Sequence, residues 1–283
     1  VGFVFRNPLE GALPPTGEIG YHNRPGPIPA VGVSKEVGER LARLASEAGR
    51  NADDPNGGNG GTGENAGADR PTVSIAVDCR NEPTTSVNAV ADVGPDTDEA
   101  VLLTAHVDAH DVSDGANDNG AGSALVAEVG RLLSTVEEDL DTRVRLITFG
   151  AEEIGLWGAY HAAETTPHEE IKCVVNLDGA CNSRNLRVSY NEFEPMRRVF
   201  ESVTDDLGAP LSTGSTISPH GDQWAFVQEG IPAVMASTTS ATVASVSRCS
   251  RSQDRVNFIA VLLAQARGGI GGGEGREAVV GQP

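Results

Sequence analysis

Side chains that can bind a metal ion or move a proton recur directly after apolar stretches of this 283-residue chain. Three apolar runs end in a histidine or in carboxylates, and a further carboxylate lies in a glycine-rich segment that opens a helix. A buried strand holds the residue that follows it at the edge of a sheet, where ligands bind. The residues concerned are His106, Asp108, Asp118, Glu152, Glu153 and Asp178.

His106 and Asp108 follow the apolar run 101–105 and are separated by one residue. In an extended chain they point to the same side, so one can bind a metal while the other orients it. Asp118 lies in the glycine-rich segment 115–122, where glycine lets the backbone approach a ligand closely. For Asp118 taken alone, a helix cap or a turn is the competing interpretation.

Two adjacent glutamates, Glu152 and Glu153, follow the run 144–149, and Asp178 follows the run 173–177. One glutamate can bind a metal while its neighbour faces water as a base; a loop of surface acids is the competing interpretation. One histidine with several carboxylates suits a divalent ion such as zinc. A carboxylate that can be shared also suits a pair of ions.

The elements that must position these residues have the pattern of an α/β fold. Nearly continuous apolar runs are typical of strands buried on both faces, here 101–105, 144–149, 173–177 and 231–236. Between them lie helical stretches at 120–134, 195–207 and 222–229. This alternation predicts a mostly parallel mixed β-sheet sandwiched by helices, with ligands at the carboxyl ends of the strands.

The N-terminal part has a different organisation. Residues 1–5, 28–33 and 73–77 read as strands, and Ser34 as the N-cap of a helix that ends near Ala48 with Gly49 as its stop. Residues 51–70 are a low-complexity linker. The four cysteines form no paired metal motif, and Cys173 reads as a buried free thiol.

Four of these segments together resemble the motifs of a known metallopeptidase family. Segments 103–108, 115–122, 149–156 and 176–178 are similar in order and spacing to those of the cocatalytic zinc aminopeptidases, metallopeptidase family 28. That family includes glutamate carboxypeptidase-like and glutaminyl cyclase members. The resemblance implies the zinc-dependent exopeptidase fold over 71–239, and residues 1–50 resemble part of a protease-associated (PA) domain.

The resemblance also implies roles for individual residues. His106 and Asp178 would bind one Zn²⁺, Asp118 would bridge two, and Glu153 would bind the second. Glu152 would be the general base for the zinc-activated water, and Asp108 would orient His106. The implied activity is hydrolysis of N-terminal peptide bonds, with peptides as the substrates.

One family ligand is missing from its expected place. The family has a late histidine after the strand that matches 231–236, whereas no histidine follows His220 here, so the second zinc site is expected to be weak. His220 and Asp222 are candidate substrate-binding residues, and His220 is also a candidate substitute ligand. The alternative function is therefore a catalytically impaired homologue that serves as a binding or interaction module. Glutaminyl cyclisation or amidohydrolysis on the same scaffold is a third possibility.

The charge of the chain excludes some partners. A net charge of −19 argues against nucleic acid and against a basic membrane-surface protein, and no apolar run is long enough for a membrane helix. Lys35 and Lys172 are the only lysines, and acid excess with few lysines is a haloarchaeal-like composition, which predicts adaptation to high salt. The acid excess stops near Ser240, so 240–283 is expected to be an atypical tail, disordered or out of frame.

The sequence leaves localisation and oligomeric state open. The chain begins at Val1 and shows no signal-peptide pattern. The default expectation is a cytoplasmic protein, and the alternative is an exported one whose N-terminus is truncated here.

Overall fold

The computed structural model describes residues 2–7, 11, 14, 20–21, 24–25, 28–53, 72–78, 80, 82–180, 186–207 and 211–238. The chain forms two compact units. The smaller comprises Val1–Thr84 with His110–Ser113, and the larger comprises Thr85–Ala109 with Asp114–Pro283.

The smaller unit pairs two short strands and carries one long helix. Strand β1 (Phe3–Arg6) runs parallel to β4 (Ala30–Val33), and β2 (Gly20–Tyr21) is antiparallel to β3 (Arg24–Pro25). Helix α1 (Lys35–Asp53) begins as predicted, because the Val37 N–H donates to the Ser34 hydroxyl oxygen at 3.4 Å. The predicted stop at Gly49 is wrong. A single glycine costs a helix only about 1 kcal/mol, which flanking helix formers offset.

The predicted strand at 73–77 is also wrong. Residues 72–78 have no regular secondary structure, although Ile75 is half-buried and its Cδ1 would lie 2.7 Å from a Cβ added at Gly2. Alternating apolar residues describe a half-buried extended chain, and only a neighbouring strand turns such a segment into part of a sheet. The strand that precedes 101–105 is instead β5 (Ala89–Val93), which the sequence analysis missed.

The larger unit is built on a seven-stranded mixed sheet in the order β10-β9-β11-β8-β6-β7-β5. Its central strands β6, β7, β8 and β11 run parallel to one another, whereas the β5–β7 and β9–β11 pairs are antiparallel. The remaining strand bounds are β6 Ala100–His106, β7 Arg143–Phe149, β8 Ile171–Leu177, β9 Leu186–Ser189, β10 Leu211–Gly214 and β11 Ala233–Thr238. The four apolar runs of the sequence are confirmed as these central strands.

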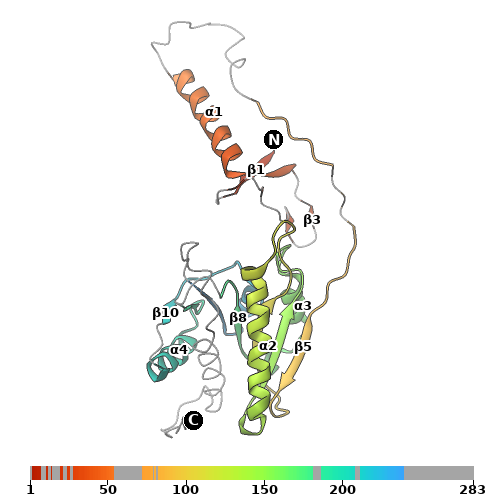
Figure 1. The fold of residues 1–283 in the computed structure, drawn as a ribbon, viewed down its shortest axis with the longest axis vertical. Helices are drawn as coiled ribbons and strands as arrows, with labels where there is room; N and C mark the ends of the chain where they lie inside the picture. The colour runs from red at the N-terminus through yellow and green to blue at the C-terminus, as the bar shows by residue number, and fades with distance from the viewer. Residues whose placement is uncertain are drawn as a thin grey trace. The chain divides into compact units, whose positions relative to one another are not determined.

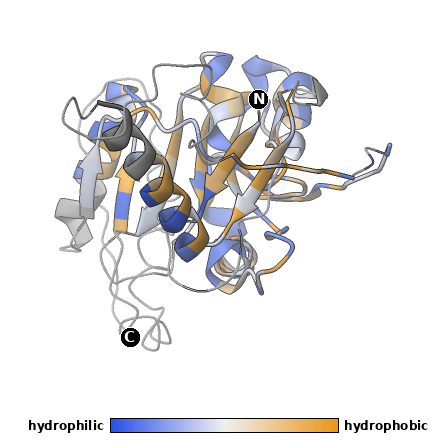
Figure 2. Cartoon of the chain, turned by 90° about the horizontal axis from the view of Figure 1, so that it is seen from above, coloured by the Kyte–Doolittle hydropathy of each residue, from blue (hydrophilic) through white to orange (hydrophobic). Residues whose placement is uncertain are grey.

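Helices cover both faces of this sheet, and each face has its own apolar cluster. Helices α2 (Ala121–Leu133) and α4 (Glu194–Leu207) contribute to one cluster, and α3 (Trp157–Thr165) and α5 (Gln223–Gln228) contribute to the other. Figure 1 shows α2 lying along the strands, and Figure 2 shows the hydrophobic residues concentrated on the sheet. The predicted fold class, a mostly parallel sheet sandwiched by helices, is confirmed.

Helix α3 was not predicted, because its buried face consists of small residues rather than large apolar ones. Gly158, Ala159, Ala162 and Ala163 are buried, which lets the helix approach the sheet closely. Single 3₁₀ or π turns complete the connections at Ala116–Gly120, Ser134–Asp139 and His168–Glu170.

Three further expectations concern the cysteines, membrane helices and the C-terminal tail. Cys173 is a buried free thiol, as predicted, whereas Cys79, Cys181 and Cys249 lie outside the described residues. None of the helices in the described ranges is both long and apolar enough to cross a membrane. The atypical tail predicted for 240–283 also lies outside the described residues.

Candidate metal centre

The carboxyl ends of three parallel strands bring the candidate residues to one edge of the sheet. Strand β6 ends in His106, and β7 and β8 end just before the Glu152–Glu153 pair and Asp178. The edge is held together by backbone hydrogen bonds: the Val107 N–H donates to the Phe149 carbonyl at 2.8 Å, and the Asp178 N–H donates to the Ala236 carbonyl at 3.1 Å.

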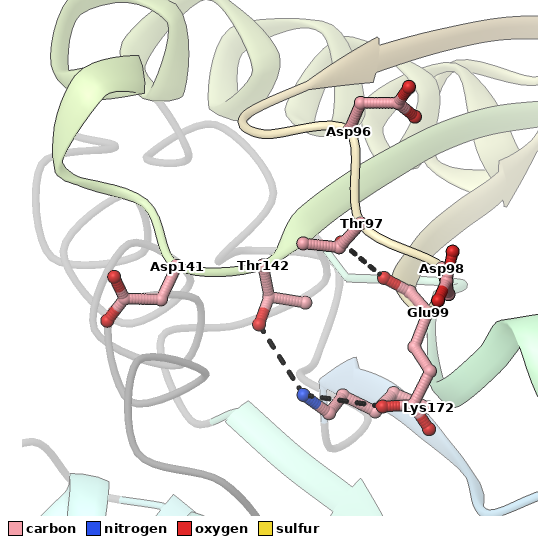
Figure 3. A pocket seen from close by; sticks show the side chains of 7 residues that line it. All are labelled: Asp96, Thr97, Asp98, Glu99, Asp141, Thr142 and Lys172. Carbon is pink, nitrogen blue, oxygen red and sulfur yellow. Dashed lines mark hydrogen bonds and ion pairs between the residues drawn. The ribbon is translucent and has the colours of Figure 1, made fainter.

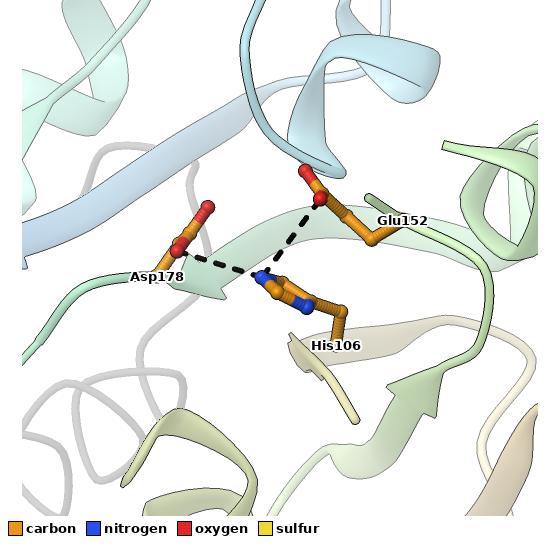
Figure 4. A group of neighbouring side chains, drawn as sticks. All are labelled: His106, Glu152 and Asp178. Carbon is orange, nitrogen blue, oxygen red and sulfur yellow. Dashed lines mark ion pairs between the residues drawn. The ribbon is translucent and has the colours of Figure 1, made fainter. Parts of the chain in front are cut away.

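His106 lies at the centre of the cluster, with 1% of its side chain exposed. Its Nε2 is 3.1 Å from Asp118 Oδ1. The same nitrogen is 3.7 Å from Asp178 Oδ1 and 3.9 Å from Glu152 Oε2, so these carboxylates converge on one imidazole nitrogen (Figure 4). The other nitrogen, Nδ1, is 3.0 Å from the Asp108 backbone carbonyl, which orients the ring.

Asp108 connects the ends of β6 and β7. Its two carboxylate oxygens accept hydrogen bonds from the backbone N–H groups of Glu152 and Glu153, both at 3.1 Å. Its Oδ1 also lies 3.7 Å from His106 Nδ1. Asp108 therefore holds the histidine and the glutamate pair in a fixed relation, which is more than the orientation of His106 that the sequence analysis expected.

Asp118 is held by the loop that opens α2. The next residue, Asn119, is fully buried and donates from Nδ2 to the Leu177 carbonyl at 2.7 Å. Its Oδ1 accepts from the Gly122 N–H at 3.1 Å, and no side chain fits at Gly122, where a Cβ would lie 2.2 Å from that oxygen. This loop presents the Asp118 side chain, 58% exposed, to His106.

Burial and crowded charges shift the pKa values in the cluster. Burial by itself lowers the pKa of His106, but the hydrogen bonds and charges of the surrounding carboxylates outweigh burial and raise it. Burial raises the pKa of Glu152 to about 9, against the opposing charge of His106. Burial also tends to raise the pKa of Asp108, but hydrogen bonds from His106 and from two backbone N–H groups lower it overall. A cluster in which carboxylates crowd one buried imidazole is the environment that a cation stabilises.

The two candidate substrate-binding residues, Asp222 and His220, differ in burial. Asp222, just before α5, is fully buried, and its carboxylate oxygens accept no hydrogen bond from the described residues. Burial raises the pKa of Asp222 to about 8, with the charges of Asp178 and Asp108 adding to that effect. His220 is exposed, and in the described part of the chain no hydrogen bond or ion pair joins it to His106.

The donor set fits a divalent metal. Within the described ranges, two groups of three side chains each have their donor atoms within 4.8 Å of one another. One group is His106 with Glu152 and Asp178, and the other is His106 with Asp118 and Glu153. All four predicted ligands and the predicted base are thus brought together, whereas His220 and Asp222 are not members of these groups. Nitrogen and oxygen donors at such spacing suit zinc.

The sequence analysis assigned no role to a buried polar set beneath this cluster. Thr104, Asn176 and Gln223 are all fully buried. Thr104 and Asn176 each interrupt an apolar run two residues before a candidate site residue, and that interruption is the signal that could have found them. Gln223 directly follows Asp222, and the sequence gives no comparable signal for it.

Comparison with known proteins adds independent information. Residues 88–259 match the family described as Peptidase family M28. The match includes most of the predicted catalytic domain and continues past Ser240 to residue 259. Leucine aminopeptidase 2 of Trichophyton equinum is 27% identical over 249 residues, which cover 82% of this chain and 45% of the relative. Aminopeptidase YwaD of Bacillus subtilis is 42% identical over 74 residues, 26% of this chain and 16% of the relative.

Solved structures agree on the fold. A zinc aminopeptidase from Bacillus subtilis, BSAP, has a TM-score of 0.64 at 22% identity, over 93% of this chain and 63% of the other. The chain thus spans about half the length of the leucine aminopeptidase that it matches, and less than two thirds of BSAP.

Proposed function

The chain belongs to peptidase family M28, as its motifs predicted, and on this premise we propose that it is a zinc-dependent exopeptidase of the aminopeptidase type. One observation carries the proposal: Glu152, Asp178 and Asp118 all converge on Nε2 of the buried His106. A proton acceptor and metal-binding side chains then share a single site.

The resemblance to the family implies which residues would hold zinc. His106 and Asp178 would bind one ion, Glu153 the second, and Asp118 would be shared between them; all four belong to the two groups of neighbouring donor atoms. When bound, zinc would polarise the scissile carbonyl and make water more acidic. Asp108 supports this arrangement, because it ties His106 to the backbone N–H groups of Glu152 and Glu153.

Glu152 is the proposed general base. Its side chain is 10% exposed and lies 3.9 Å from His106 Nε2, so it borders the ligand cluster while remaining sheltered from bulk water. It would accept a proton from the attacking water and return that proton to the nitrogen of the departing peptide.

The charge of the site favours a substrate with a free amino terminus. Six carboxylates border the cluster, namely Asp108, Asp118, Glu152, Glu153, Asp178 and Asp222. Asp222 is protonated near neutral pH because burial raises its pKa to about 8, and with Glu152 ionised as the base the other five carboxylates carry five negative charges. Two divalent ions supply four positive charges, so a negative field would remain. Such a field attracts an α-ammonium group and repels a C-terminal carboxylate. The relatives named as aminopeptidases support the same choice.

The alternative, an impaired homologue that acts as a binding module, rests on the missing late histidine. The segment expected to carry that ligand lies outside the described residues. The enclosed position of Glu152 among the ligand side chains is of no use to a binding module, and this supports the enzyme.

The test is metal content together with peptidase activity. Purified full-length chain should bind zinc and hydrolyse aminoacyl-p-nitroanilides, lose activity on chelation and recover it with added zinc. The matched control is the same nitroanilide with its amino group acetylated, which should be hydrolysed far more slowly. A zinc-loaded chain that cleaves neither substrate would overturn the proposal, and equal cleavage of both would overturn the aminopeptidase assignment.

A further inference from the structure

A line of hydrogen-bonded polar side chains crosses the core beneath the metal centre. The Thr104 hydroxyl donates to Asn176 Oδ1 at 2.8 Å. Asn176 Nδ2 donates to Gln223 Oε1 at 3.1 Å, and Gln223 Nε2 donates to the Ser218 carbonyl at 2.9 Å. We call Thr104, Asn176 and Gln223 the amide relay. All three side chains are fully buried, so water does not compete for these hydrogen bonds.

The Ser218 carbonyl at the end of the amide relay determines how the side-chain amides of Gln223 and Asn176 are oriented. The Ser218 backbone carbonyl can only accept, so the amide nitrogen of Gln223 must face it. The Gln223 oxygen then faces Asn176, which must present its own amide nitrogen there and its oxygen to Thr104. A single arrangement satisfies all three groups, and such a network defines one spacing of the elements that carry it.

The amide relay lies directly between the apolar core and the metal centre. Thr104 and Asn176 are paired residues of the parallel β6–β8 ladder. On the same face of these strands, Leu102 and Val174 belong to the apolar cluster below, and His106 and Asp178 lie above. Gln223 directly follows Asp222 at the start of α5. Each residue of the relay is therefore one or two positions from a residue of the site.

Gly221 lies beside both the amide relay and the site. A Cβ added at Gly221 would lie 2.6 Å from Gln223 Oε1 and 3.4 Å from both Asn176 Nδ2 and Asp178 Oδ2. The last two side chains of the relay and a proposed zinc ligand therefore border the same small space, and a side chain at position 221 would press on all three.

The far end of the amide relay is anchored as well. The Ser218 N–H donates to Asn191 Oδ1 at 2.9 Å, and Asn191 Nδ2 donates to the Ala233 carbonyl of β11 at 3.1 Å. The loop that accepts the last hydrogen bond of the relay is therefore attached to the sheet. The relay connects fixed elements at both ends.

We propose that the amide relay positions the zinc ligands: it sets the spacing between β6, β8 and the start of α5, and so the separation of His106 from Asp178. Thr104, Asn176 and Gln223 are positioning residues that touch neither metal nor substrate. This inference rests on the proposed function for the identity of the metal. Polar groups that orient metal ligands typically contribute 10- to 100-fold to metal affinity.

The test compares zinc affinity in full-length variants, measured by competition with a chromogenic chelator. Thr104→Val removes the first donor at nearly unchanged volume and should weaken zinc binding about 10- to 100-fold. Gln223→Met removes the central acceptor and should have an effect of the same size. Thr104→Ser keeps the hydroxyl and should bind zinc as the wild type does.

Thr142→Val is the matched control. Thr142 is also buried, 6% exposed, and its hydroxyl lies 3.5 Å from Lys172 Nζ, near the start of the strands rather than their carboxyl ends. The Thr142→Val substitution replaces a hydroxyl by a methyl group, as Thr104→Val does, and it lies in the same unit of the fold. It should leave zinc affinity unchanged. Thermal unfolding of the metal-free variants shows whether the two valine variants lose comparable stability.

Three results would each overturn the proposed role of the amide relay. The first is that Thr104→Val and Gln223→Met bind zinc as tightly as the wild type, and the second is that Thr142→Val loses as much affinity as they do. The third is a wild-type chain that binds no zinc. A wild type that binds zinc and leaves aminoacyl-p-nitroanilides intact overturns the proposed function alone, because the affinities of the variants still decide the relay.

Discussion

The two ends of the central sheet both gather acidic side chains, yet only one of them is built to hold a cation. At the carboxyl ends of the strands, carboxylates surround His106. At the opposite end lies a pocket of about 490 Å³ lined by Asp96, Thr97, Asp98, Glu99, Asp141, Thr142 and Lys172 (Figure 3). Four of its seven lining residues are acidic, so composition alone does not separate the two ends.

The two ends of the sheet differ in whether basic side chains neutralise their carboxylates and in how far those carboxylates are exposed to water. In the pocket, Lys172 Nζ lies 3.8 Å from Glu99 Oε2, and Arg143 Nη1 lies 3.5 Å from Asp96 Oδ1. The side chain of Asp96 is fully exposed and that of Glu99 is 53% exposed, so water solvates these charges. In the metal centre, Glu152 and Asp178 are 10% and 12% exposed and share one imidazole.

A high number of acidic residues is therefore a weak indicator of a metal site, whereas buried carboxylates that converge on one point are a strong indicator. Exposed carboxylates beside basic side chains lose little by remaining unmetallated. Buried carboxylates that face one another are destabilised in their charged form by desolvation and by mutual repulsion, and a bound divalent ion offsets both effects. Matched substitutions at the two ends should therefore have very different effects.

The largest difference is expected for glutamate-to-glutamine changes. Glu152→Gln removes the proposed base and should lower kcat about 10²- to 10⁴-fold with zinc content unchanged. Glu99→Gln, in the pocket, should leave kcat within the error of measurement. Steady-state kinetics with metal analysis check both, and full turnover in Glu152→Gln would assign the base to another residue.

A smaller difference is expected for aspartate-to-asparagine changes. Asp178→Asn removes a proposed ligand and should weaken zinc binding about 100-fold, which is about 2.8 kcal/mol. The same change should lower the melting temperature of the metal-free protein at neutral pH, because it removes a carboxylate that faces the buried imidazole of His106 at 3.7 Å and helps to raise its pKa. Asp141→Asn in the pocket should change neither quantity. If Asp178→Asn raises the melting temperature instead, the favourable pairing of Asp178 with His106 is wrong.

The pH dependence of stability should sharpen the contrast further. Burial raises the pKa of Asp222 to about 8 and that of Glu152 to about 9, above their ordinary values of 3.8 and 4.5. The folded metal-free protein therefore holds protons that the unfolded chain releases, so its free energy of unfolding falls as pH rises through that interval. The slope is at most about 1.4 kcal/mol per pH unit for each group.

Asp222→Asn should flatten this slope between pH 5 and 8, whereas Asp96→Asn at the exposed end should leave it unchanged. Urea denaturation at several pH values in the presence of a chelator measures both. A wild-type stability that increases with pH across this window would contradict the sign derived from the buried carboxylates.

The smallest effect is expected in the pocket itself. Lys172→Met removes the partner of Glu99 and Thr142, and a half-exposed ion pair of this kind contributes at most about 1 kcal/mol to stability. Zinc affinity should stay at the wild-type value. A loss of zinc binding in Lys172→Met would show that the two ends of the sheet are coupled.

Much of the fold was predictable because it depends on local patterns. The apolar runs that became β6, β7 and β8 are nearly continuous, as is typical of strands buried on both faces. The predictions failed where the sequence pattern alone does not determine the structure. Residues 73–77 alternate as a strand does but have no strand partner among the described residues, and the small residues of α3 give no amphipathic signal.

The candidate residues that the structure brings together were also predicted from sequence, because each lies shortly after an apolar run or within a glycine-rich segment. Their convergence on one atom of His106 was not visible there. Nor was the amide relay, since Thr104 and Gln223 are 119 positions apart and only the contact of α5 with β8 brings Gln223 to Asn176. Asp222 was placed on the substrate side, and its complete burial became evident only in the folded chain.

The amino-acid sequence by itself therefore determined the fold class, the family and the strand ends at which the candidate ligands lie, because these follow from hydrophobic periodicity and from motif spacing within short segments. The tertiary structure decided which carboxylates are buried against one another, which are neutralised by Lys172 and Arg143, and which polar groups hold the strands in register. Those properties depend on desolvation and on distances between elements far apart in the chain, and only packing specifies them.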